Sequence, residues 1–128
     1  MEMKKIRNCV LIEPLTCKEN DSIVYVAQKL REVILKHIFV VNENDCPVGI
    51  ISMTDINNRV VAEGKDPNKL KAKDIMSTPI DIADIEDDLE SSCEKMLENN
   101  HVMKAVVENG KMKGIITIHQ LMKNLERK

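Results

Sequence analysis

The sequence predicts an α/β (α+β) fold of two tandem β-α-β-β-α repeats. Residues 48–56 (VGIISMTDI) recur 65 positions later as residues 113–121 (KGIITIHQL). Each copy is a short apolar β run that ends at Ser or Thr and passes directly into an amphipathic helical pattern. The chain has 128 residues, so each half is too small to bury a stable core alone. We therefore expect the two halves to share a core or an interface.

Apolar periodicity and turn residues define the elements of the first repeat. Helical spacing begins after Asp21 or Ser22, either of which can cap a helix, and Gly64 favours the left-handed backbone that follows a helix. β-Branched runs on both sides of an Asn-Glu-Asn-Asp turn predict a hairpin. The expected elements are a strand (14–17), a helix (22–35), two hairpin strands (37–41 and 47–52) and a second helix (53–63).

The same order is expected after a charged, proline-containing linker (65–69). A short helix (70–76) introduces the second repeat, and Asn109-Gly110 is a strong signal for a tight hairpin turn. The expected elements are then a strand (79–82), a helix (88–99), two hairpin strands (102–107 and 112–117) and a final helix (118–125). This order divides the chain into repeat 1 (residues 1–64), a linker with a lead-in helix (65–75) and repeat 2 (residues 76–128).

Composition argues against nucleic acid as a partner. The formal net charge is -2, and basic and acidic residues are interspersed, so the sequence has no basic stripe for a phosphate backbone. Aromatic residues make up 2% of the chain, only Tyr25 and Phe39, which leaves hardly any platform for base stacking. A bound purine would have to lie between aliphatic side chains.

The cysteines and the N-terminal region indicate a cytoplasmic protein. The apolar run from Cys9 to Ile12 is too short for a signal-peptide core or a membrane span, so we expect no membrane partner. The four cysteines form no C-x-x-C pair and have no histidine at zinc-finger spacing. We expect reduced, mostly buried thiols rather than metal ligands at Cys9, Cys17, Cys46 and Cys93.

Three segments resemble the CBS domain, the module named for cystathionine β-synthase. Residues 14–23 (PLTCKENDSI) are similar to the family's opening strand and helix entry, and residues 73–76 (KDIM) resemble the segment that introduces a repeat. The most specific likeness is the pattern G-h-h-[ST]-x-x-[DN], where h is apolar, filled by residues 49–55. In the second copy, residues 114–120, Gln120 replaces the final Asp or Asn. Nearly all of the chain thus resembles a tandem CBS pair, or Bateman module.

The resemblance implies a fold, a ligand class and a regulatory function. Such pairs form two pseudo-symmetric units with two clefts between the repeats, where AMP, ADP, ATP or S-adenosylmethionine commonly binds as a regulatory ligand. Two pairs usually associate, so a homodimer is expected. These modules regulate and do not catalyse. Because the sequence carries no effector domain, the output would pass to an unknown effector protein or through the dimer itself.

Ser52 and Asp55 are the first candidate ligand-binding residues. A carboxylate one turn into a helix, beside a hydroxyl, can accept both hydroxyls of a ribose, as Asp or Glu does in dinucleotide-binding folds. The same spacing also suits a helix N-terminus, and Thr117 with Gln120 makes a full capping box. The residues alone favour capping in both copies. The resemblance favours ribose binding at Ser52 and Asp55 only, although Gln120 could still hydrogen-bond a ribose.

Basic residues just before the second strand often face phosphates in ligand-binding relatives. Lys36 and His37 occupy that place here. A solvated lysine at a helix end and a partly buried histidine explain them equally well. In the second repeat Val102 and Met103 stand at the corresponding positions, and only Lys104 could substitute for the basic pair.

The resemblance also places the adenine against the first strand of the opposite repeat. For the cleft at Asp55 that means Ile80 and its neighbours. For the cleft at Gln120 it means Leu15 and Thr16. Ordinary core packing is the simpler explanation of each residue, and we expect the Asp55 cleft to be the one that binds.

Two function classes remain open after this comparison. The first is a module that senses an adenosine-containing ligand. The alternative is a structural or protein-interaction module with degenerate, empty clefts, which the substitution at Gln120 favours for the second site. No Ser-His-Asp or Cys-His order, phosphate-binding loop or pair of carboxylates stands out, so we expect neither an enzyme nor a catalytic residue. His101 and His119 are interpreted as surface or loop residues.

Overall fold

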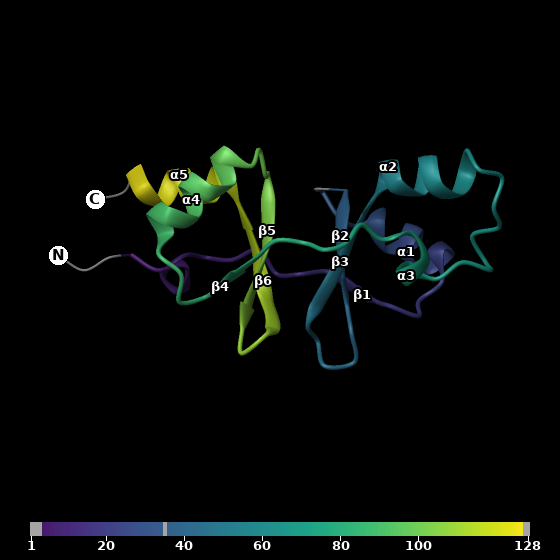
Figure 1. Ribbon diagram of the computed structural model, residues 1–128, viewed down its shortest axis with the longest axis horizontal. Coiled ribbons are helices and arrows are strands. Elements are labelled where there is room, and N and C mark those ends of the chain that lie inside the picture. The colour runs from purple at the N-terminus through teal and green to yellow at the C-terminus, as the bar shows by residue number, and fades with distance from the viewer. Residues whose placement is uncertain (1–3, 35, 127–128) are drawn as a thin grey trace. The chain divides into compact units, whose positions relative to one another are not determined.

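The computed structural model describes residues 4–34 and 36–126 and forms two compact units (Figure 1). The first unit runs from Leu15 to Ile80, and the second combines Met1–Pro14 with Asp81–Lys128. Each unit has a three-stranded sheet and an apolar core of its own. The mixed α/β fold of two β-α-β-β-α repeats, predicted from the sequence, is confirmed.

The elements of the first unit follow the predicted order: β1 (Thr16–Lys18), α1 (Ile23–Leu30), β2 (His37–Val41), β3 (Pro47–Ser52), α2 (Met53–Ile56), the π-helix η2 (Asn57–Val61) and α3 (Ala72–Ile75). Strand β1 lies parallel to β2, and β2 pairs antiparallel with β3. The register sets His37 opposite Ser52 and Ile38 opposite Ile51.

The elements of the second unit repeat this arrangement after a short 3-10 helix: η1 (Ile6–Asn8), β4 (Ile82–Asp84), α4 (Leu89–Glu98), β5 (Met103–Glu108), β6 (Lys111–Thr117) and α5 (Ile118–Glu126). Strand β4 lies parallel to β5, which pairs antiparallel with β6. Both hairpins carry a register shift at the same place, between Val40 and Val41 and between Val106 and Val107.

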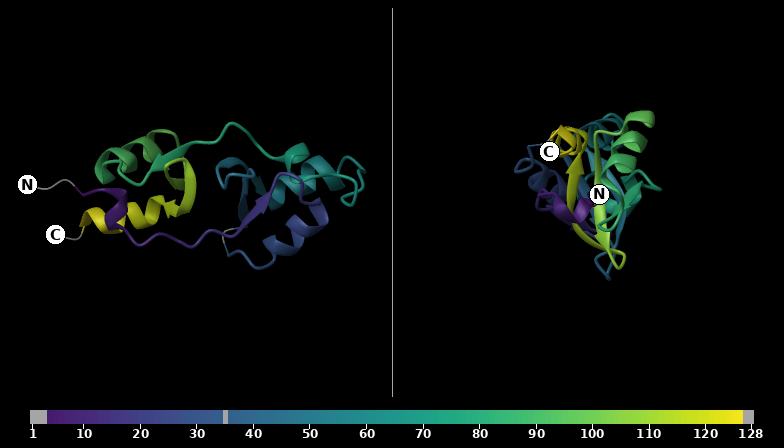
Figure 2. Two further views of the ribbon diagram at one scale, coloured as in Figure 1. Left: turned by 90° about the horizontal axis from the view of Figure 1, so that it is seen from below. Right: turned by 90° about the vertical axis from the view of Figure 1, so that its left-hand side faces the viewer.

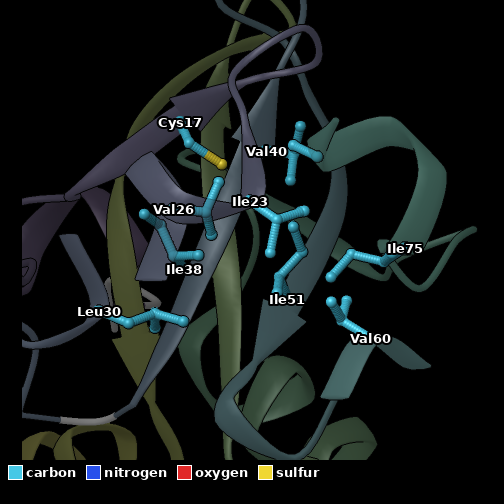
Figure 3. Packing of buried hydrophobic residues seen from close by; sticks show 10 residues of the cluster. Cys17, Ile23, Val26, Leu30, Ile38, Val40, Ile51, Val60 and Ile75 are labelled. Carbon is cyan, nitrogen blue, oxygen red and sulfur yellow. The ribbon is translucent and has the colours of Figure 1, made fainter. Parts of the chain in front are cut away.

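The first core forms where one face of α1 packs on alternate residues of the sheet. Because successive strand residues point to opposite faces, one helix-covered face collects the apolar side chains. The cluster in Figure 3 consists of ten buried residues: Cys17, Ile23, Val26, Leu30, Ile38, Val40, Ile51, Val60, Ala72 and Ile75. The second unit has a matching cluster that includes Leu89, Met96, Val106 and Ile116.

Three predicted boundaries differ from the structure. Helix α1 ends at Leu30 rather than near residue 35, because Ile34 is 93% exposed and offers no buried contact to hold another turn. The first strand begins two residues later than predicted in the first unit, at Thr16, and three residues later in the second, at Ile82. Pairing with the middle strand fixes this register.

The division of the chain also differs at its N-terminal end. Residues 4–14 belong with the second unit, whereas the sequence analysis assigned them to repeat 1. Ile6 is fully buried in the second core, and its backbone N–H donates to the Asp87 carbonyl oxygen at 3.0 Å. In Figure 2 the purple N-terminal segment runs beside the yellow helix α5, where Lys4 Nζ donates to the Asn124 carbonyl oxygen.

The segment before β4, which contains Ser77, and the segment before β1, which contains Ile12, make equivalent backbone contacts. We call them the lead-in segments. Ser77 exchanges hydrogen bonds with Ile50 on β3, and Ile12 does so with Ile115 on β6. This close approach explains the glycine of the repeated pattern. A Cβ atom at Gly49 would collide with the Met76 side chain, and one at Gly114 would lie 2.7 Å from the Leu11 Cβ atom.

The helices of the described part of the chain are short. The longest of them, α4, has 10 residues, and none of them is long and apolar enough to cross a membrane.

Candidate functional site

Ser52 and Asp55 form a reciprocal cap at the start of α2. Asp55 Oδ2 accepts a hydrogen bond from the Ser52 backbone N–H at 2.8 Å, and Ser52 Oγ accepts one from the Asp55 N–H at 3.1 Å. The capping that the spacing predicts is therefore present. It uses one carboxylate oxygen only. Among the described residues, Asp55 Oδ1 accepts no hydrogen bond, and the Asp55 side chain is 19% exposed.

Arg59 is the neighbour of Asp55 that the sequence analysis missed. Its Nε atom lies 3.9 Å from Asp55 Oδ1, and its Nη1 atom donates to the Ile75 carbonyl oxygen at 2.7 Å. The signal was present in the sequence, because residues four apart lie on the same side of a helix. Arg59 stands in the π-helical turn η2, and such turns often occur at functional sites.

His37 is the other predicted residue that the structure brings to Ser52. The two residues face each other across the β2–β3 pair. Their neighbours Ile38 and Ile51 point into the core, so His37 and Ser52 point to the opposite face of the sheet. The His37 side chain is exposed.

Lys36 lies on the α1 side of α2. Its backbone is left-handed, with φ 57°, and its Nζ atom is 3.5 Å from the Leu30 carbonyl oxygen at the end of α1. It lines a cavity of about 160 Å³ together with Met53 and Ile56 of α2, Ala27 and Leu30 of α1, and Arg31 just after α1. Neither Ser52 nor Asp55 lines this cavity. The predicted ligand residues therefore divide between two sides of α2.

The predicted adenine contacts are partly buried in the first unit. Thr16 pairs with Phe39 and is half-buried, on the sheet face opposite the buried Cys17. Leu15 is exposed, and Ile80 is half-buried at the end of the unit. A polar cavity of about 260 Å³ opens at the far ends of β1 and β2, lined by residues 18–20 and 41–44. It contains none of the predicted residues.

Thr117 and Gln120 form the corresponding cap in the second unit. Gln120 Oε1 accepts from the Thr117 N–H at 3.1 Å, and Thr117 Oγ1 accepts from the Gln120 N–H at 3.2 Å. The other end of the amide is also used, because Gln120 Nε2 donates to the Val10 carbonyl oxygen at 3.0 Å. The Gln120 side chain therefore connects α5 to the segment before β1, which contains Val10.

Lys104 points into the second unit. It lies opposite Ile116 of the core cluster and is only 8% exposed. A lysine in this direction cannot replace the basic pair of the first repeat. His101 Nδ1 is buried 3.2 Å from Asp81 Oδ2, and His119 is exposed on α5.

The cysteines are free thiols. Cys17 and Cys93 are buried, whereas Cys9 and Cys46 are half-buried. Burial raises the pKa of the Cys17 thiol to about 12, with the nearby Asp21 carboxylate acting in the same direction. The residues that the structure describes contain no group of three potential metal ligands.

Comparison with known families identifies the repeats. The family model of the CBS domain matches residues 6–62 and 72–127. The chain belongs to the CBS domain family. The two matches follow one another along the chain, so it is a tandem CBS pair, as its resemblance predicted.

One curated relative and two solved CBS structures show how far the likeness extends. An uncharacterized protein of Methanopyrus kandleri is 32% identical over 111 residues, which cover 84% of this chain and 56% of that protein. This chain thus spans about half the length of that relative. The CBS domain protein of Pyrobaculum aerophilum complexed with AMP has a TM-score of 0.74 at 25% identity, covering 91% of this chain and 89% of its own. A CBS domain pair in complex with 5′-methylthioadenosine and S-adenosyl-L-methionine has a TM-score of 0.76 at 23% identity, covering 97% of each chain.

Proposed function

We propose that this CBS pair is a regulatory module that binds an adenosine-containing ligand, AMP, ADP, ATP or S-adenosylmethionine, at the Asp55 site. The observation that carries the proposal is the second carboxylate oxygen of Asp55. The helix cap uses Oδ2, whereas Oδ1 accepts no hydrogen bond from a described residue and has only Arg59 Nε nearby, at 3.9 Å, so it can accept from a hydroxyl donor. A ribose diol supplies two such donors in a geometry that a carboxylate accepts. The AMP complex of the Pyrobaculum aerophilum protein supports this ligand class.

The neighbouring residues of the first unit have complementary roles in this proposal. The Ser52 hydroxyl accepts from the backbone and can still donate its own hydrogen to the ribose. His37 stands across the strand pair from Ser52, and we assign it to a phosphate or a carboxylate of the ligand. Lys36 contributes positive charge at longer range. Ile80 supplies apolar contacts to the adenine, whereas Thr16 belongs to the other predicted cleft, at Gln120.

The second site differs because Gln120 is already fully engaged. Both ends of its amide form hydrogen bonds, to Thr117 and to the Val10 carbonyl oxygen. A ribose would have to displace at least one of these bonds, and amide hydrogen bonds of this kind contribute about 1 kcal/mol each. We therefore propose that Thr117 and Gln120 do not hold a ligand and that each chain binds one.

Thermal unfolding tests the proposal directly. The purified protein is heated with AMP, ADP, ATP, S-adenosylmethionine or NAD from micromolar to millimolar concentration. A ligand at 100 times its dissociation constant adds about 2.7 kcal/mol to the folded state, a rise of several degrees for a chain of this size. A selective rise with one adenosine compound is expected. If none of these compounds raised the unfolding temperature, the proposal would be refuted.

The variant Asp55→Ala should abolish this rise, but it also removes a helix cap. Asp74→Ala is the matched control, because Asp74 Oδ2 accepts from the Lys71 N–H at 2.8 Å in an equivalent cap on α3. Both variants should lower the unfolding temperature of the free protein by a similar amount. Only Asp55→Ala should lose the ligand-induced rise. Unchanged ligand affinity in Asp55→Ala would show that the ribose is placed wrongly.

A protein-interaction module is the second candidate function, favoured by the occupied Gln120 amide. Both candidates regulate through association rather than catalysis, and we propose a homodimer that acts on an effector protein in the cytoplasm. Light scattering after size exclusion, with and without AMP, measures the first part. A monomer under all conditions would reject the dimer without affecting the ligand site.

A further inference from the structure

The cavity between α1 and α2 of the first unit has features of a separate ligand site. It has a volume of about 160 Å³ and is partly open to solvent. Apolar cavities of roughly 150 Å³ hold a molecule the size of benzene. We propose that this cavity binds a small amphipathic carboxylate whose apolar part has the size of a benzene ring or a short acyl chain. The cavity shares Lys36 with the proposed adenosine site, but neither Ser52 nor Asp55 lines it, so the two sites can be tested separately.

The walls of the cavity are aliphatic. Ala27 and Leu30 come from α1, and Met53 and Ile56 come from α2, one turn apart. An apolar group that enters displaces water from these side chains, which is favourable in proportion to the area covered. Met53 adapts readily to different ligand shapes, because it is unbranched and partly exposed.

Two cations complete the lining, Arg31 and Lys36. Within the described part of the chain, no carboxylate forms an ion pair with either of them. The Nζ atom of Lys36 makes only a long contact with the Leu30 carbonyl oxygen. A guanidinium group binds a carboxylate through two parallel hydrogen bonds. The charge pattern therefore fits an anionic head beside an apolar body.

The second unit shows that the repeat does not need these cations. Counted from the first helical residues, Ile23 and Leu89, position 97 within α4 corresponds to position 31 just after α1, and Val102 precedes β5 as Lys36 precedes β2. The residues there are Leu97 and Val102, which are 54% and 65% exposed. Cations at the end of a helix suit its dipole, but α4 ends without an equivalent pair. The positive charge is thus a property of the first unit alone.

Fluorine NMR with 4-fluorobenzoate as the probe tests this inference on the full chain. Binding should broaden the probe signal and shift the methyl signal of Met53. Arg31→Gln removes a positive charge, and Ala27→Leu fills the cavity. Each variant should therefore lower the affinity for the probe by about tenfold or more. Lys65→Gln is the control, because Lys65 is an exposed cation that does not line the cavity. Its affinity should match that of the native chain.

The same samples separate this site from the adenosine site. Asp55→Ala should still bind 4-fluorobenzoate but no longer bind AMP. Arg31→Gln should still bind AMP but bind 4-fluorobenzoate more weakly. Equal probe affinity in Arg31→Gln and the native chain would overturn the inference. So would a Met53 signal that shifts with protein concentration in the absence of the probe, since a second copy would then cover the cavity. Hexanoate in place of 4-fluorobenzoate distinguishes acyl from aromatic ligands.

Discussion

The two units have the same backbone arrangement, but the residues that fill their cores differ. In the first unit the Ala72 N–H donates to the Asp21 carbonyl oxygen, and in the second the Ile6 N–H donates to that of Asp87. Val26 and Ile38 belong to the first core, whereas the matching positions in the second unit hold Ser92 and Lys104, both buried. Backbone hydrogen bonds thus preserve the repeat while its interior diverges. The second core tolerates these two buried polar residues because the remaining cluster is apolar.

The helix caps differ in a second way. In the first unit Asp55 caps α2, while the lead-in carbonyl of Ile75 is held by a separate residue, Arg59. In the second unit Gln120 performs both tasks alone. When two residues divide the tasks, one oxygen of the Asp55 carboxylate is left without a hydrogen bond and has only Arg59 Nε nearby, whereas in Gln120 both ends of the amide are hydrogen-bonded. A binding position can thus be lost to a structural role without a change of fold.

The largest expected effect comes from making the first core resemble the second. Ile38→Lys places an ammonium group at a fully buried position without an acidic partner, and should lower the free energy of unfolding by about 3 kcal/mol or more. Urea denaturation measures the loss. Ile38→Val is the control and should cost only about 1 kcal/mol. If both variants lost the same amount, the first core would be as tolerant as the second.

The next effect is a pH dependence that only the first unit should have at this position. Below pH 9 the Cys17 thiol is neutral in both the folded and the unfolded chain. Above pH 9 the unfolded chain ionises while burial keeps the folded thiol neutral up to about pH 12, so stability falls as pH rises. The slope is about 1.4 kcal/mol per pH unit, which makes roughly 2 kcal/mol by pH 10.5.

Cys17→Ala isolates this contribution, because the matching residue of the second unit is the buried Ala83. Unfolding of the two proteins is compared from pH 8 to pH 10.5, so that lysine titration cancels. The native protein should lose stability relative to the variant across this range. A constant difference would mean that the Cys17 thiol ionises as readily in the folded chain as in the unfolded one.

A smaller gain should follow from making the second core resemble the first. Lys104→Ile removes a buried ammonium group and should raise the free energy of unfolding by about 1–2 kcal/mol. Adding Ser92→Val should increase the gain, because the two positions would then match Ile38 and Val26. Urea denaturation of the single and double variants measures both steps. Destabilisation by Lys104→Ile would show that the lysine makes a compensating interaction.

The smallest effect concerns the hydrogen bonds that Arg59 and Gln120 donate to the backbone of the two lead-in segments. Arg59→Ala removes one hydrogen bond to a backbone carbonyl and should cost about 1 kcal/mol, whereas Gln120→Ala removes such a bond together with the α5 cap and should cost about 2 kcal/mol. Amide exchange should rise locally, around Ile75 in the first variant and around residues 10–12 in the second. Exchange that rises equally throughout the chain would contradict a local role for these hydrogen bonds.

The repeat, its hairpins and both caps could be predicted because each depends on local chemistry. Asn109-Gly110 encodes a tight turn, and Ser22 caps α1 as its position predicts. The glycine at position 49 could be recognised as a pattern but not explained, since the side chain that excludes a Cβ atom belongs to Met76. That contact joins residues far apart in the sequence.

The rest of the site depends on tertiary packing. Nothing local indicates that residues 4–14 join the second core, because Ile6 meets its partners only after the chain has folded. The direction of Lys104 was open for the same reason, since strand alternation fixes its face only once the pairing with Ile116 is known. Arg59 could have been found from its spacing to Asp55, but its bond to the Ile75 carbonyl could not.

The most direct test of the central claim is the number of AMP molecules bound per chain, measured by isothermal titration calorimetry on the native protein, Asp55→Ala and Gln120→Ala. We predict one site in the native chain, none in Asp55→Ala and one in Gln120→Ala with little change in affinity. Two sites in the native chain, or a single site that survives Asp55→Ala and disappears in Gln120→Ala, would contradict the account.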